Sequence, residues 1–152
     1  MSANRHLGRI IALQTLYEQD FRAACKDKSF KLPEVLKRNI NRYQAMVDDP
    51  SFIERLVNGV NAKQKELDEL LQPIAPEWPI DQIARIDRIV LRIGAYELLF
   101  EPDTPPKVVI NEGVELAKGF GGDNSSKFVN GVLGSVLRQQ ESDKSPKKKK
   151  KD

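Results

Sequence analysis

The sequence predicts an all-α fold of about seven helices, arranged as two three-helix subdomains. Apolar residues recur at spacings of three and four along most of the chain, as on the buried face of a helix. Prolines and glycines interrupt this pattern at intervals that suit short helices joined by turns. No segment shows a convincing strand pattern, and 152 residues is the usual length of one domain or of two small subdomains that share a core.

Subdomain 1, about residues 4–72, is expected to hold three helices. Apolar periodicity places them at about residues 4–24, 31–47 and 50–72. Pro33 stands at a first-turn position of the second helix, where its missing N–H costs nothing. Asp49 and Pro50 introduce the third helix. Three prolines then mark the junction between the subdomains: Pro73, Pro76 and Pro79.

Subdomain 2, about residues 79–141, begins with a short turn over residues 80–83. The segment 83–100 is the most apolar in the chain and is predicted to be the central, nearly surrounded helix. Pro105 and Pro106 begin the next helix, and glycines after it suit a left-handed turn at its end. Asn124, Ser125 or Ser126 caps the last helix. Residues 143–152 contain no apolar side chain, so a disordered, lysine-rich tail is expected.

Two glycines inside the last helix raise a question about packing. Gly131 and Gly134 each cost about 1 kcal/mol relative to alanine in a helix interior. They lie three residues apart, on one side of the helix. We expect another helix to approach the backbone there, which would fix the orientation of Lys127 and Phe128 at the helix start.

Composition excludes several classes of protein. Residues 1–142 hold 19 lysines and arginines against 20 aspartates and glutamates, so the positive charge of the whole chain belongs to the tail. No apolar run is long enough for a membrane span, and a cytoplasmic location follows as the expectation. With one cysteine, Cys25, read as a packing residue, and one histidine, no metal, cofactor or catalytic site is expected.

Three groups of residues are candidates for binding an anion. Arg85, Arg88 and Arg92 lie on one stripe of the central helix, either as phosphate contacts or as a solvated face with local ion pairs. Cations in the first turns of a helix are unfavourable for stability but suit an anion site; the candidates there are Arg5, His6 and Arg9. Phe128 beside Lys127 is either core or a platform for an unpaired base.

Four ordered motifs resemble the NusB family of transcription antitermination factors. They are "ALQTLYEQDF" in the first helix, "LRIGAYEL" in the central helix, "PPKVVINEGVELAKGFG" and "KFVNGVL". The resemblance runs from about Arg5 to Arg138. It implies two three-helix bundles packed at an angle and a protein that is not an enzyme. It also implies binding of the boxA element of ribosomal RNA transcripts together with ribosomal protein S10 (NusE), within a complex of other Nus factors on RNA polymerase.

The resemblance also assigns residues to each partner. The family's arginine-rich motif corresponds to Arg5, His6 and Arg9, and its RNA-contacting arginine and stacking aromatic correspond to Arg92 and Phe128. Arg88 and Lys127, which lie beside them, are the further candidates for RNA binding. Positions that face S10 correspond to Tyr17, Asp81, Asp87 and Asn124. The arginine-rich motif at the N-terminus is thinner here than is usual in the family, and the five lysines of the tail, residues 147–151, can attract a polyanion in its place.

Two rival interpretations stay open. A similar domain precedes the catalytic domain of certain RNA cytosine methyltransferases, although no S-adenosylmethionine-binding segment follows in this sequence. A homodimeric scaffold that self-associates through the surface around Tyr17 is the second alternative. The preferred RNA bases, the RNA affinity, the oligomeric state of the free protein and its regulatory use do not follow from the sequence.

Overall fold

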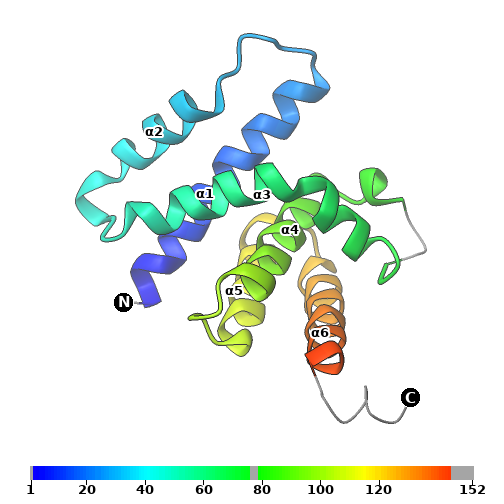
Figure 1. The fold of residues 1–152 in the computed structure, drawn as a ribbon. Coiled ribbons are helices and arrows are strands. Elements are labelled where there is room, and N and C mark those ends of the chain that lie inside the picture. The colour runs from blue at the N-terminus through cyan, green and yellow to red at the C-terminus, as the bar shows by residue number, and fades with distance from the viewer. Residues whose placement is uncertain (1, 76–78, 145–152) are drawn as a thin grey trace.

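A computed structural model describes residues 2–75 and 79–144, and all regular structure within them is helical (Figure 1). The all-α prediction is therefore confirmed. The elements are α1 (Ser2–Ala24), α2 (Leu32–Arg42), η1 (Gln44–Met46), α3 (Pro50–Leu71), η2 (Ile80–Gln82), α4 (Arg85–Phe100), α5 (Pro106–Phe120) and α6 (Ser125–Lys144), where η marks a short 3₁₀ helix. No helix in this part of the chain has the length and apolar character needed to cross a membrane.

The helices pack in two groups around α4 (Figure 1). Helices α1, α2 and α3 contact one another, as do α4, α5 and α6. Helix α4 also packs against α1 and α3, and every residue from Arg88 to Leu98 is buried. A single hydrophobic cluster therefore joins both groups, and α4 is the central helix that its composition predicted.

Local sequence signals account for the starts of α3 and α5. The side chain of Asp49 accepts a hydrogen bond from the Phe52 N–H at 3.3 Å, and Pro50 follows it in the first turn of α3. Pro106 likewise occupies the first turn of α5. The predicted helix 31–47 was too long, because α2 ends at Arg42 and η1 turns the chain toward Asp49.

The glycine hypothesis for the last helix is wrong. Gly131 is exposed, with open space where a Cβ would stand, and at Gly134 only the guanidinium of Arg138 comes near. The close approach occurs on the facing helices. A Cβ at Gly94 of α4 would lie 2.6 Å from Leu133 Cδ1, and one at Gly113 of α5 would lie 2.9 Å from the same atom. The branched end of Leu133 on α6 therefore fills space that two missing side chains leave.

Three smaller expectations also change. Gly121 ends α5 with φ of −97° rather than in a left-handed turn, and its backbone lies so close to Ser125 that a Cβ would stand 2.7 Å from Ser125 Cβ. Cys25 follows α1 as an exposed thiol, not a packing residue. Helix α6 continues through Lys144, past the expected start of the tail at residue 143, and residues 145–152 lie outside the described part of the chain.

Candidate functional site

A buried ion pair holds the start of α1 on α4, and a longer contact joins it to Glu112 of α5. Arg9 is 2% exposed and donates two hydrogen bonds of 2.8 Å to the Glu97 carboxylate, which is 1% exposed. This two-pronged geometry is that of an ionised pair. Burial opposes the charge on Arg9, but the bonds and charge of Glu97 outweigh it and raise the pKa of Arg9. Burial also raises the pKa of Glu97, and the hydrogen bonds and charge of Arg9 offset this increase only in part.

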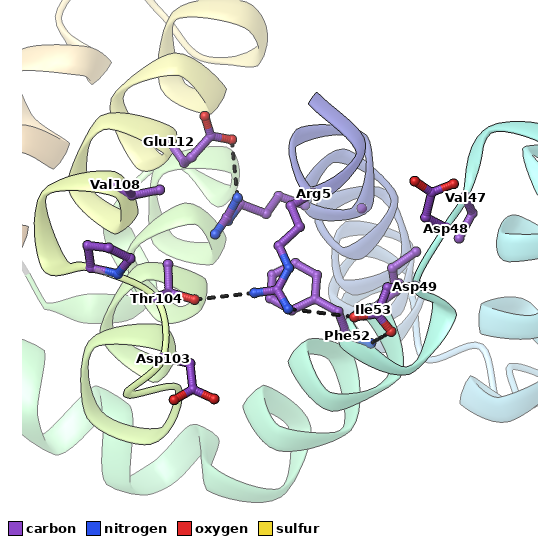
Figure 2. Close-up of a pocket in the computed structure, with 13 residues that line it drawn as sticks. Arg5, Val47, Asp48, Asp49, Phe52, Ile53, Asp103, Thr104, Val108 and Glu112 are labelled. Carbon is purple, nitrogen blue, oxygen red and sulfur yellow. Dashed lines mark hydrogen bonds and ion pairs between the residues drawn. The ribbon is translucent and has the colours of Figure 1, made fainter. Parts of the chain in front are cut away.

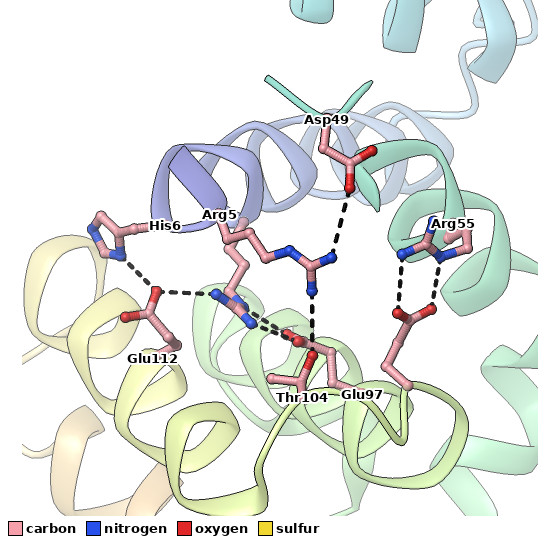
Figure 3. A network of polar contacts seen from close by, with 9 residues as sticks. Arg5, His6, Asp49, Arg55, Glu97, Thr104 and Glu112 are labelled. Carbon is pink, nitrogen blue, oxygen red and sulfur yellow. Dashed lines mark hydrogen bonds and ion pairs between the residues drawn. The ribbon is translucent and has the colours of Figure 1, made fainter. Parts of the chain in front are cut away.

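The side chains of Arg5 and His6 contact residues at the start of α3, in the turn before α5 and on α5 itself. The Arg5 guanidinium lies 4.1 Å above the centre of the Phe52 ring, donates to Thr104 Oγ1 at 3.3 Å and stands 3.6 Å from Asp49 (Figure 3). His6 Nδ1 lies 2.8 Å from Glu112 Oε1. The predicted cation cluster at the start of α1 is therefore matched by carboxylates of α3, α4 and α5.

The arginine stripe of α4 faces Asp20 near the end of α1. Arg85 Nε and Arg88 Nη2 donate to Asp20 Oδ2 at 2.6 and 2.7 Å. Arg92 forms two hydrogen bonds of 2.8 and 2.9 Å with Asp68 of α3. The stripe is confirmed, but Arg88 and Arg92 are only 8% and 6% exposed. The ion pairs of the alternative interpretation are confirmed, but Arg88 and Arg92 point inward and do not form a solvated face.

Asp20 should make stability fall at acid pH. Burial by itself would raise the pKa of Asp20, but the hydrogen bonds and charges of Arg85 and Arg88 hold it below its usual value of about 3.9. The unfolded chain then takes up this proton first as the pH falls, so the stabilisation is present above about pH 4 and is lost below it.

We expect wild type to lose more of its free energy of unfolding between pH 5.5 and pH 3, measured in urea, than Asp20→Asn does. At pH 5.5 Asp20→Asn should be less stable by about 1 to 3 kcal/mol. Equal losses on acidification would contradict this role for Asp20.

The start of α6 is the one predicted RNA-binding segment with an exposed cation that forms no ion pair within the described residues. Lys127 is exposed there. Phe128 is half-buried and packs against the core, so its ring is part of the core, and its role as a platform for a base stays a prediction. Asn124 is exposed just before the helix, and its carbonyl accepts from the Phe128 N–H at 3.1 Å. Asn124, Lys127 and Phe128 therefore form one local surface.

Three residues predicted to face a protein partner lie around the arginine stripe. Tyr17 of α1 is half-buried, with the Arg85 guanidinium 5.6 Å from its ring centre. The backbone carbonyl of Asp81 in η2 accepts a hydrogen bond of 2.9 Å from Arg88, and Asp81 is exposed. Asp87, in the first turn of α4, keeps a buried Oδ1 without a hydrogen-bond partner among the described residues.

The predicted RNA-binding residues thus fall into separate groups. Arg5 and Asp20 are 15 residues apart on one straight helix, which places them about 22 Å from each other. The group around Arg5 and the group around Asp20 are therefore at different ends of α1. The structure does not gather all the predicted cations onto one continuous surface.

Comparison with known proteins identifies the family of this chain. The model of the NusB family matches residues 6–138. The chain belongs to the NusB family. A transcription antitermination protein NusB of Dehalococcoides mccartyi strain CBDB1 is 43% identical over 138 residues, covering 91% of this chain and 92% of that protein. The chain is thus a member of a transcription antitermination family, as its motifs predicted.

Solved structures of NusB proteins share the fold. NusB of T. maritima matches with a TM-score of 0.78 and 30% identity, covering 89% of this chain and 91% of that one. A crystal structure of the antitermination factors NusB and NusE in complex with double-stranded RNA matches with a TM-score of 0.76 and 26% identity, covering 91% of this chain and 99% of that one.

Sequence reasoning missed the carboxylates that neutralise the arginines of this NusB-family chain. They are Asp20, Asp68, Glu97 and Glu112. Glu97 had a signal, because it is the one charged residue of the apolar run 93–100 in the central helix. Phe21 was also missed as a surface residue: it is 49% exposed, one turn after Tyr17, and lies beside the Arg85 guanidinium.

Proposed function

We propose that this protein binds the boxA element of ribosomal RNA transcripts as a heterodimer with ribosomal protein S10 (NusE) and promotes ribosomal RNA transcription. It would act in the cytoplasm by assembly, with other Nus factors on RNA polymerase, and without catalysis. The observation that carries the proposal is family membership across residues 6–138. A structural neighbour that contains NusB, NusE and RNA supports it.

In this proposal the RNA lies across the start of α6. Lys127 is exposed and unpaired within the described residues, so it is available to a phosphate. Phe128 is half-buried, and we propose that a splayed base stacks on the part of its ring that stays exposed. Arg5 and His6 keep partly exposed side chains and could add outer contacts.

Arg9, Arg88 and Arg92 receive a supporting role in the proposal. Each is at least nine-tenths buried and donates to a carboxylate. Contact with a phosphate would require breaking a pair and leaving a buried charge unmatched, which costs several kcal/mol. We therefore propose that Arg9 and Arg88 fix the packing of α1 on α4 and that Arg92 fixes α3 on α4. Tyr17, Asp81, Asp87 and Asn124 contribute to the proposed S10 surface.

Phe128→Leu tests the RNA site with the least damage to the core. Leucine retains most of the apolar packing but removes the stacking ring, which is worth about 1 to 3 kcal/mol per base. We expect the complex with S10 to bind boxA RNA about 5- to 150-fold more weakly, measured by electrophoretic mobility against a scrambled RNA.

Phe100→Leu is the matched control for this prediction. Phe100 is also half-buried but lies in the last turn of α4, where it packs against Tyr96. It should leave RNA affinity unchanged. If Phe128→Leu and Lys127→Ala together also leave the affinity of the S10 complex intact, the proposed RNA site is wrong.

A further inference from the structure

A cavity of about 360 Å³ opens between the start of α1, the start of α3 and the turn that precedes α5 (Figure 2). We call it the α1/α3/α5 cavity. Its apolar lining comes from all sides except α1: Val47, Phe52, Ile53, Pro105 and Val108. Val108 is 40% exposed at this surface. Cavities of this size, with a largely apolar lining and a few polar groups, are typical of binding sites.

Carboxylates outnumber cations around the cavity. Four acidic residues line it, namely Asp48, Asp49, Asp103 and Glu112, against Arg5 and Arg9. Arg9 is already matched by the buried Glu97, so it adds no free positive charge. Asp103 is exposed and has no ion-pair partner within the described residues. The lining therefore has a surplus of negative charge, which repels RNA phosphates and attracts a cation.

The walls of the cavity are held in place by contacts already formed. Asp49 caps α3 through the Phe52 N–H, and the buried Thr104 accepts from Arg5. Figure 2 shows the Arg5 side chain extending between Thr104 and Asp49 over the Phe52 ring. A site whose walls are fixed before binding loses less entropy when a ligand enters.

We propose that the α1/α3/α5 cavity binds a protein partner through one aliphatic or aromatic side chain, carried on a segment with a lysine or arginine next to it. The apolar wall takes the anchor, and the carboxylates take the neighbouring cation. A single buried apolar anchor with a charged rim is a common way to concentrate binding energy. This partner surface shares Arg5 with the outer contacts of the RNA surface proposed above and is otherwise separate from the RNA and S10 surfaces.

A peptide titration tests the inference on the full-length protein. The probe is acetyl-Gly-Arg-Leu-Arg-Gly-amide, followed by ¹H–¹⁵N correlation spectra. We expect saturable shifts confined to the backbone N–H signals of the segments that line the cavity, residues 5–9, 47–53 and 103–112, whose prolines give no such signal. Acetyl-Gly-Arg-Ser-Arg-Gly-amide lacks the anchor and acetyl-Gly-Glu-Leu-Glu-Gly-amide lacks the cations, so each should bind at least tenfold more weakly.

A pair of charge reversals sharpens the test. Asp103→Lys removes the free carboxylate of the cavity and should weaken binding of the first peptide at least threefold. Asp123→Lys makes the same change at an exposed site beyond the other end of α5 and should leave it unchanged. Non-saturable shifts, shifts elsewhere on the protein, equal binding of the acidic peptide, or equal effects of both variants would overturn the proposal. Because the titration contains neither RNA nor S10, its failure leaves the proposed function untouched.

Discussion

Glu97→Gln is expected to lower the free energy of unfolding by about 3 to 5 kcal/mol. The substitution keeps the shape of the side chain but removes the charge that faces Arg9, and both side chains are almost completely buried. Removing one member of such a pair leaves the other as an unmatched buried charge, which accounts for the size of the loss. Glu112 lies 3.4 Å from Arg9 and can compensate only in part. Urea unfolding followed by circular dichroism measures the change.

Two further variants separate burial from the loss of charge itself. Glu115→Gln makes the same change where both members of the pair with Lys118 are more than half exposed, and it should alter stability by less than about 0.5 kcal/mol. The double substitution Arg9→Met with Glu97→Leu removes both charges and should be more stable than Glu97→Gln alone. A Glu97→Gln protein as stable as Glu115→Gln would show that the pair does not hold α1 on α4.

The Arg9 pair also shows where prediction from sequence succeeded and where it stopped. Helical periodicity and proline positions gave the helices, because these signals act within a few residues of one another. The stripe of Arg85, Arg88 and Arg92 followed from spacing alone. The residues that the stripe faces could not be predicted from spacing. Asp20 is 65 residues from Arg85 in the chain, and their pairing depends on how α1 crosses α4.

Lys127 and Phe128 illustrate the same limit for the candidate site. Their place at the start of a helix was predicted from the motif and confirmed as local structure. Whether they share a surface with Arg5 is a question of tertiary arrangement, which spacing along the chain does not determine. For the glycines, the sequence shows where side chains are missing, but it does not show which glycine faces a neighbouring helix.

Leu133→Ala is expected to lower the free energy of unfolding by about 2 to 5 kcal/mol. Leu133 is 0% exposed and sits between α4 and α5, with its Cδ1 close to both Gly94 and Gly113. Truncation leaves a cavity whose floor is backbone, which can collapse little. Gly94→Ala should also destabilise, since overpacking costs about 1 to 3 kcal/mol and the better helix propensity of alanine offsets only part of it.

The double variant Gly94→Ala with Leu133→Ala tests whether the two residues share this space. The added methyl can enter the cavity left by the truncated leucine, so the double variant should lose less stability than the two single variants together. Gly131→Ala is the matched control: the same substitution, at an exposed helix position with no neighbour, should stabilise by up to about 1 kcal/mol. If Gly94→Ala stabilised the protein as Gly131→Ala does, Leu133 would not be fitted against the α4 backbone. Because Lys127 and Phe128 lie in the first turn of α6, a fixed Leu133 also fixes the orientation of the proposed RNA site.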